Sequence, residues 1–194
     1  MTRLDRQLEF LRHIDQLKNV IRQSPLIDQS RRENSAEHFW HLGLYACVLA
    51  EYAHESVDVS RVVRMLLIHD IVEIDAGDTP LNLPHDAAEQ AEREHRAAER
   101  IFGLLPAEQA QEFKNLWKEF EAAESADAQF AKSLDRLQPL VHNLATGGGT
   151  WIPPRVTETQ VQERYGVPIQ RGAPHLWERA RELVRQHFAV RAKE

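Results

Sequence analysis

Apolar residues recur at intervals of three or four along most of this chain, and this spacing is what most constrains its fold. The first segment carries them at Leu4, Leu8, Leu11, Ile14, Leu17 and Ile21. Such intervals place side chains on one face of an α-helix. The eight glycines and nine prolines cluster between the periodic segments instead of interrupting them. The sequence therefore predicts an all-α fold.

The later segments repeat this periodicity. The second helix should begin near Asn34 or Ser35, because either residue is a suitable N-cap. Further helices are expected over about 59–74, 85–103, 107–122, 126–144, 157–165 and 176–190. The GGGTWIPP stretch at 147–154 breaks the pattern sharply. The sequence shows no domain boundary, so we expect one domain over residues 1–194.

Composition narrows the class of partners. A net charge of −6 argues against binding to a nucleic acid polymer or an anionic membrane, but it leaves room for a small phosphate in a local basic pocket. No stretch approaches the ~20 apolar residues of a membrane span, and the N-terminus lacks a signal-peptide core. We therefore expect a cytoplasmic protein. The single cysteine, Cys47, lies in the apolar run LGLYACVLA and is predicted to be buried.

Ionisable residues gather in HDIVEIDAGD, residues 69–78, directly after the apolar run MLLI. On a helix, residues four apart lie about 40° apart around the axis, so His69 and Glu73 would share a face beside Asp70. Burying such groups is costly unless they are paired or bind a metal ion. A buried histidine satisfied by a neighbouring acid is the simpler alternative for this pair alone.

Two other residues could join the pair around one metal ion. His38 lies one turn into the second predicted helix, and an antiparallel hairpin would bring that turn to the end of the third. Asp135 lies in a helix with Pro139, which cannot donate to the carbonyl of residue 135, so we expect a kink. Two imidazoles and two carboxylates suit one divalent ion such as manganese, cobalt, iron or zinc, with magnesium also possible.

The order of these residues resembles a known family. An EH pair, an HD pair and a distant aspartate together resemble the HD-domain metal-dependent phosphohydrolases. These residues are His38, His69, Asp70 and Asp135. The HDxxExxxxD spacing with Glu73 and Asp78, and the upstream RRENSAEH, are most similar to the bacterial 5'-deoxynucleotidase branch. The resemblance covers roughly residues 21–140.

The resemblance implies an HD-type helical bundle. Its metal-binding core would span about 34–144, with C-terminal helices over 155–194 packed on it. It also implies that the four residues bind one divalent metal ion and that the reaction removes phosphate from a nucleoside 5'-monophosphate. A homodimer is implied by the same resemblance.

Glu73 and Asp78 are the expected proton-transfer residues. A metal ion of this kind acidifies bound water and offsets negative charge on the phosphoryl oxygens. Glu73 is close to the expected ion without being needed as a ligand, so it could exchange protons with that water or with the departing 5'-oxygen, as could Asp78. Which residue is the acid stays open. Without the family resemblance, Asp78 in AGDTP reads equally well as a turn residue.

Three arginines are candidates for phosphate binding. Arg31 and Arg32 lie a short loop ahead of His38, and Arg22 lies further upstream. Arg31 matches the arginine of the family's R-x-E-N pattern. Around Arg22 the sequence departs from the family, because RQSPL lacks the aromatic residue that follows the family's arginine. We therefore expect weaker discrimination between ribose and deoxyribose.

Two other functions stay open at this stage. One is another HD reaction, on a cyclic nucleotide or a guanosine polyphosphate. Further histidines forming a second metal site would favour it, but His41 and His142 show no convincing ligand pattern. The other is a metal- or nucleotide-binding regulator without turnover. The presence of both Glu73 and Asp78 argues against it, since binding alone needs no proton-transfer pair.

Overall fold

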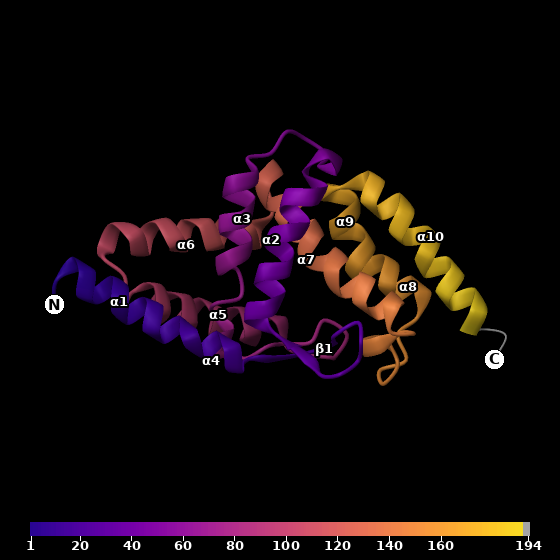
Figure 1. The fold of residues 1–194 in the computed structure, drawn as a ribbon, viewed down its shortest axis with the longest axis horizontal. Helices are drawn as coiled ribbons and strands as arrows, with labels where there is room; N and C mark the ends of the chain where they lie inside the picture. Colours follow the sequence, from indigo (N-terminus) through magenta and orange to yellow (C-terminus); the bar gives the residue numbers. More distant parts are fainter. Residues whose placement is uncertain (192–194) are drawn as a thin grey trace.

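A computed structural model describes residues 1–191 and confirms the all-α prediction (Figure 1). The helices are α1 (Arg3–Ile14), α2 (Ser35–Leu49), α3 (Val59–Ile68), α4 (Glu73–Ala76), α5 (Ala87–Phe102), α6 (Ala107–Ala122), α7 (Ala126–Ala145), α8 (Glu158–Val161), α9 (Val167–Gly172) and α10 (Pro174–Arg191). Short 3₁₀ turns cover Asp15–Asn19, Ala50–Tyr52 and Gly149–Trp151, and a π-helical turn covers Gln162–Gly166. Among residues 1–191, no helix is both long and apolar enough to cross a membrane.

Helix α7 is the centre of the bundle. It contacts α2, α3 and α6, and it also contacts the C-terminal helices α9 and α10, which lie beside it in Figure 1. Its buried side chains include the apolar Phe130, Leu134 and Leu140 and the polar Asp135 and Gln138. Polar groups on α7 are therefore enclosed by helices from both ends of the chain.

A small β-hairpin replaces the end of the first predicted helix. After α1 and a 3₁₀ turn, β1 (Ile21–Pro25) pairs antiparallel with β2 (Arg32–Asn34), with Ile21 opposite Asn34. The prediction of a helix up to Ile21 was therefore wrong. Pro25 explains part of the difference, because the residue before a proline disfavours helical geometry. The hairpin brings Arg22 and Glu33 to the interior of the bundle, since both side chains are largely buried.

The third predicted helix also ends early. Helix α3 stops at Ile68, and α4 begins only at Glu73. The intervening turns are tight, because Ile71 N–H donates to Ile68 O at 3.2 Å and Glu73 N–H donates to Asp70 O at 3.0 Å. These bonds span three residues, as in a 3₁₀ helix. His69 and Glu73 therefore do not lie on one regular α-helix, contrary to the sequence prediction.

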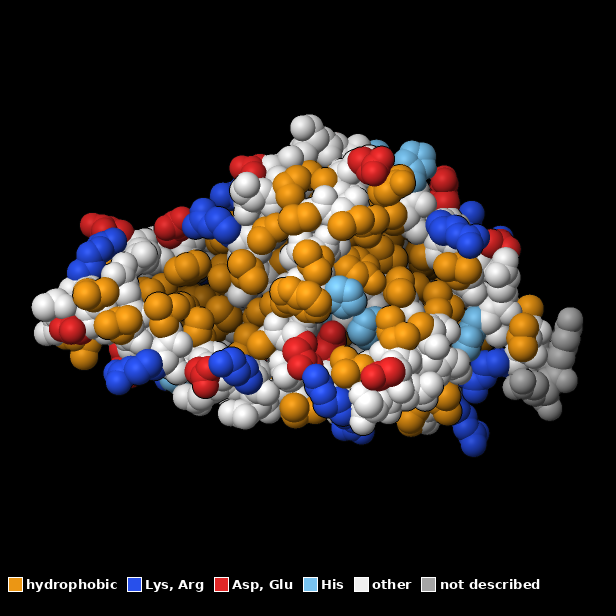
Figure 2. Space-filling model, viewed as in Figure 1, with side chains coloured by type: hydrophobic (Ala, Val, Ile, Leu, Met, Phe, Trp, Pro, Cys, Tyr) orange, Lys and Arg blue, Asp and Glu red, His pale blue; other side chains and the backbone are white. Residues whose placement is uncertain are grey.

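Cys47 is exposed, which corrects the prediction that it is buried. The inner face of α2 contains Phe39, Leu42 and Ala46. Cys47 follows Ala46 and is turned about 100° further around the helix. The outer face is also apolar, with exposed Trp40, Leu44 and Val48. Figure 2 shows apolar side chains gathered over this central part of the surface. An apolar run in this helix therefore does not identify its buried face.

Gly172 sets the closest approach of α9 to α7. A Cβ atom at this position would lie 2.1 Å from the backbone oxygen of Gln129. We predict that Gly172→Ala lowers the free energy of unfolding by about 1–3 kcal/mol, as overpacking typically does. Urea denaturation measures this change. Gly43→Ala in α2 is the control, because no atom lies within 4 Å of its added Cβ. Equal stability of the two variants would contradict this packing.

Candidate metal centre and active site

The four predicted metal ligands come together from three parts of the fold. His38 comes from α2, His69 and Asp70 follow α3, and Asp135 comes from α7. One potential ligand atom of each lies within 4.8 Å of the others. His38 Nε2 is 3.2 Å from Asp135 Oδ1, and His69 Nε2 is 3.0 Å from Asp70 Oδ2. His69 Nε2 also lies 3.4 Å from Asp135 Oδ1.

Hydrogen bonds at the opposite ring nitrogens orient both imidazoles. His69 Nδ1 is 2.8 Å from the backbone oxygen of Leu66, and His38 Nδ1 is 3.2 Å from Gln138 Oε1. Both oxygens accept, so each Nδ1 carries a proton and each Nε2 faces the carboxylates. His69 Nε2 is buried without a hydrogen-bond partner. A buried ring nitrogen that faces two carboxylates needs either a proton or a metal ion between them, so the cluster fits a divalent metal ion.

The charges of this cluster shift the pKa values of its members. Burial lowers the pKa of His69, but Asp70 and Asp135 outweigh burial and raise it to about 10. Burial, followed by the charge of Arg22, lowers the pKa of His38 to about 4. Burial raises the pKa of Asp70, but its charged neighbour His69 lowers it to about 2. A proton on His69 Nε2 and a metal ion among the four residues therefore exclude each other. Binding of an ion should release this proton.

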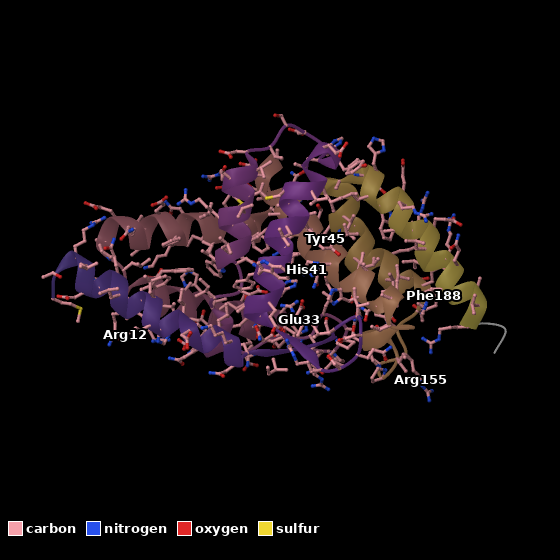
Figure 3. All side chains as sticks on the ribbon, in the orientation of Figure 1. Arg12, Glu33, His41, Tyr45, Arg155 and Phe188 are labelled. Carbon is pink, nitrogen blue, oxygen red and sulfur yellow. The ribbon has the colours of Figure 1, made fainter. Side chains whose placement is uncertain are left out.

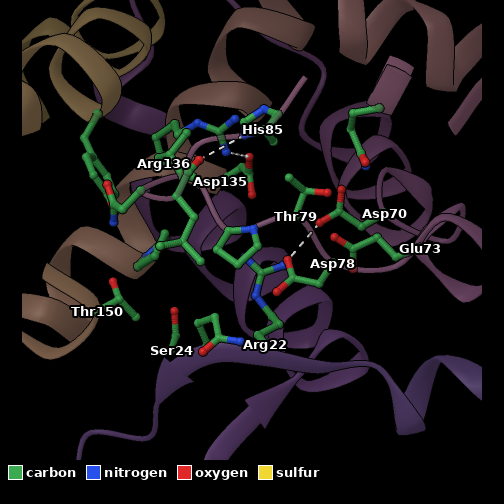
Figure 4. A pocket seen from close by; sticks show the side chains of 18 of the residues that line it. Arg22, Ser24, Asp70, Glu73, Asp78, Thr79, His85, Asp135, Arg136 and Thr150 are labelled. Carbon is green, nitrogen blue, oxygen red and sulfur yellow. Dashed lines mark hydrogen bonds and ion pairs between the residues drawn. The ribbon is translucent and has the colours of Figure 1, made fainter. Parts of the chain in front are cut away.

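Glu73 and Asp78 lie beside the ligands. Glu73 is the first residue of α4 and is 8% exposed, and Ser35 Oγ donates to its Oε2 at 2.8 Å. Burial, and then the charge of Asp70, raise the pKa of Glu73 well above its usual range. Burial also raises the pKa of Asp78. Both carboxyl groups line the same cavity as Asp70 (Figure 4). A carboxyl group with a raised pKa is suited to proton transfer.

The cavity has a volume of about 740 Å³, which suits a small-molecule ligand. Three of the four predicted ligands, His69, Asp70 and Asp135, line it together with several charged side chains. Thr150 and Ser24 lie across the cavity from Glu73 (Figure 4). Other uncharged residues also line it, namely Thr79, Asn82, Leu83, Ile152, Pro153, Pro154 and Tyr165. The lining therefore includes a charged group of residues and a largely neutral one.

The three predicted arginines occupy different positions. Arg22 lies in the cavity, with Nη1 3.3 Å from Asp70 Oδ2. Arg32 also lines the cavity. Arg31 does not, because its side chain is 54% exposed and its terminal nitrogens donate to Glu37 at 2.6 and 2.8 Å. Glu37 belongs to the capping box at the start of α2, so Arg31 supports the helix end. This placement favours a structural role for Arg31 over the expected contact with the substrate.

Two further cations line the cavity and were not identified from the sequence. Lys132 and Arg136 both belong to α7, and Arg136 Nη1 is 2.5 Å from Asp135 Oδ2. Residues three or four apart share a helix face. The spacing of Lys132 and Arg136 around Asp135 could therefore have predicted, from the sequence alone, that both cations lie near Asp135.

A second group of potential ligands lies near the first. Glu33, His41 and His142 each have one potential ligand atom within 4.8 Å of the other two. Glu33 and His41 lie near the first turns of α2 (Figure 3), and His142 comes from α7. No local spacing in the sequence links these histidines to Glu33, because this group forms only when β2, α2 and α7 pack together.

A helical bundle with a cluster of His and Asp side chains beside a cavity has the arrangement of a metal-binding domain. The chain belongs to the HD domain family, whose sequence profile matches residues 14–177. This match covers the β-hairpin, all four ligands and the start of α10.

Three known proteins illustrate the relationship. The human 5'-deoxynucleotidase HDDC2 is 34% identical over 137 residues, which are 69% of this chain but only 65% of that protein. The 5'-deoxynucleotidase yfbR of Photorhabdus temperata is 28% identical over 136 residues, covering 66% of this chain and 68% of that one. A crystal structure from Magnetospirillum magnetotacticum MS-1, described as a predicted metal-dependent phosphohydrolase, is 54% identical with a TM-score of 0.90, covering 96% of this chain and 93% of that one.

Loss of one imidazole should empty the metal centre. We predict that His69→Ala lowers metal affinity at least roughly tenfold, because the change removes a ligand and leaves two carboxylates facing each other. Metal content after dialysis, measured by mass spectrometry, tests this. His175→Ala is the control, since His175 is an exposed residue of α10 paired with Glu178. Full metal occupancy of His69→Ala would refute the ligand assignment.

Proposed function

We propose that this protein is a metal-dependent phosphohydrolase that removes phosphate from nucleoside 5'-monophosphates. The observation that carries the proposal is the convergence of His38, His69, Asp70 and Asp135 at a cavity that also holds Glu73 and Arg22. The names of the human and Photorhabdus relatives support a nucleotide substrate, and the Magnetospirillum structure supports a phosphohydrolase.

Positive side chains beside the ligands would bind the phosphate. A divalent ion held by the four residues would acidify water and offset phosphoryl charge. Arg22 is held in place by Asp70 and, at 3.7 Å, by Glu33. Lys132 and Arg136 add positive charge from α7. Charge-assisted hydrogen bonds from such groups are strong and directional, so they would orient a terminal phosphate toward the ligands.

Glu73 is the residue that we assign to proton transfer. Hydrolysis requires a proton for the departing 5'-oxygen and the loss of a proton from water. The raised pKa of Glu73 favours a carboxyl group that holds a proton, and the hydrogen bond from Ser35 fixes its position. Asp78 is the neighbouring group that can share this task, because it lines the same cavity.

The neutral part of the cavity would accept the nucleoside. Gln23 and Ser24 line it where the family places an aromatic residue after its arginine. Small or flexible side chains at these positions leave room for a 2'-hydroxyl group. We therefore infer that ribonucleotides and deoxyribonucleotides are both accepted.

The finer properties follow from the ligand set and the resemblance. Nitrogen and oxygen ligands favour manganese, cobalt, iron or zinc, with magnesium possible. We infer a homodimer from the family resemblance, and the exposed Trp40, Leu44 and Val48 on α2 support an apolar contact between copies. Light scattering measures the oligomeric state. A location in the cytoplasm stays a prediction from the sequence.

A phosphate-release screen tests the proposed activity. The metal-loaded protein should release phosphate from paired ribo- and deoxyribonucleoside 5'-monophosphates with cobalt or manganese, and a chelator should stop it. Cyclic nucleotides and guanosine polyphosphates are included as competing substrates. Activity on those compounds with none on any monophosphate would overturn the proposed substrate class.

Glu73 should be needed for turnover but not for metal binding. We predict that Glu73→Gln keeps its metal and loses about 100-fold or more in kcat, since general acid–base catalysis contributes ~10²–10⁴-fold. Asp75→Asn is a matched control in the same helix, because Asp75 pairs with Arg100 at the surface. Loss of metal from Glu73→Gln would make Glu73 a ligand instead.

Arg22 and Arg31 should differ in their contribution to turnover. We predict that Arg22→Ala lowers kcat/KM about 10- to 100-fold, because a hydrogen bond to a charged group contributes ~1.5–3 kcal/mol. Arg31→Ala should stay close to the wild type, since this side chain pairs with Glu37 outside the cavity. Steady-state kinetics on one monophosphate compares them. Equal losses in the two variants would contradict the observed positions.

A further inference from the structure

We propose that Gln138 is a positioning residue that fixes the ring of His38 for metal binding, and that Glu33, His41 and His142 form a cage of acceptors around its amide. The inference rests on the proposed metal-dependent function and adds a residue that holds one ligand in place. It also gives the second group of potential ligands a role other than binding a second ion.

Gln138 connects the two clusters directly. It is fully buried in α7, three residues after Asp135. Its Oε1 is 3.2 Å from His38 Nδ1, on the side of the metal ligands. Its Nε2 donates to Glu33 Oε1 at 2.8 Å and lies 3.2 Å from His142 Nε2 and 3.5 Å from His41 Nδ1. The two ends of one amide therefore face different groups.

The neighbours of the amide determine which end faces which group. An ionised carboxylate only accepts hydrogen bonds, so the amide nitrogen must face Glu33. The other oxygen of this carboxylate, Glu33 Oε2, lies 3.7 Å from Arg22 Nε, and this ion pair favours the ionised form. The amide oxygen then faces His38, and His38 Nδ1 must carry the proton. This tautomer leaves the lone pair of His38 Nε2 pointing at the metal ligands.

The same contacts argue against a second metal ion. Metal ions lie about 2.0–2.2 Å from nitrogen and oxygen ligands. Gln138 Nε2 lies 2.8 to 3.5 Å from an atom of Glu33, His142 and His41, so the amide group stands where these side chains converge. Turning the amide oxygen toward an ion there would remove the acceptor from His38 Nδ1. A hydrogen bond from His38 Nδ1 to the Gln138 oxygen and an ion bound by that same oxygen therefore exclude each other.

Gln138 orients the ring of His38 through a hydrogen bond at Nδ1, as a backbone carbonyl orients the ring of His69. The Nδ1 of His69 is held by the carbonyl of Leu66, which no side-chain substitution removes. The support of His38 is a side chain and is open to mutation. Substituting Gln138 should therefore affect one imidazole and leave the other in place.

Metal affinity tests the positioning role. Gln138→Leu keeps a similar volume but removes both hydrogen bonds, and it should weaken zinc binding about 10- to 100-fold, as loss of a ligand's outer partner does. Competition with a chromophoric chelator at pH 8 measures the affinity. The visible spectrum of the cobalt form should change as well. Ser133→Ala is the matched control, because Ser133 is buried in α7 and donates only to the backbone oxygen of Phe130.

A double variant separates positioning from packing. Glu33→Gln with Gln138→Glu exchanges the amide and the carboxylate, so residue 138 still accepts from His38 while residue 33 donates. We expect this pair to recover most of the zinc affinity lost in Gln138→Leu. A general packing defect would not be repaired by the exchange, so failure of this rescue counts against the inference.

A measurement on the wild type avoids any folding defect. In the zinc form, nitrogen NMR should show a proton on His38 Nδ1 and the metal on Nε2. The reverse assignment would overturn the inference, as would wild-type zinc affinity in a folded Gln138→Leu protein. If the wild type bound a second equivalent of zinc and His142→Ala abolished that binding, the proposed role of Glu33, His41 and His142 as acceptors around the Gln138 amide would be wrong. A wild-type protein that binds no metal or releases no phosphate would instead refute the proposed function.

Discussion

Two imidazoles and two carboxylates meet around one point, three of them buried and Asp70 half-buried, and the surrounding fold stabilises this arrangement. Charged groups in the interior must be paired, hydrogen-bonded or joined by a cation. Here α2, the end of α3 and α7 each supply part of the set, so the site forms only when these helices pack. Metal binding and folding are therefore linked, because an ion that binds the folded state stabilises it.

Several of the candidate site residues lie at or just beyond the ends of helices. His69 and Asp70 follow the end of α3, Glu73 opens the short helix α4, and Arg22 comes from the hairpin. Asp135 is one turn before Pro139, which cannot donate to its carbonyl. The tight turns after Ile68 interrupt the regular helix. His69, Asp70 and Glu73 nevertheless line one cavity.

Apolar periodicity predicted most of the helices, and the resemblance to the HD-domain family singled out the four residues that the structure brings together. Of the two N-cap candidates, Asn34 caps α2. The hairpin was missed because its strands are only five and three residues long and follow an apolar stripe. The direction of the Arg31 side chain depends on that hairpin and on Glu37, so the sequence did not show that it lies outside the cavity. The proximity of His142 to Glu33 links positions more than a hundred residues apart, which no local spacing reveals.

The polar contacts around the metal centre close into a ring. Starting from one carboxylate, it runs through Asp70, Arg22, Glu33, Gln138, His38, Asp135 and His69 and returns to Asp70. A substitution in this ring disturbs at least two neighbours at once, and His38 Nδ1 also lies 3.6 Å from Glu33 Oε2 across it. The effects of two substitutions within the ring should therefore not add, because the substituted residues share partners.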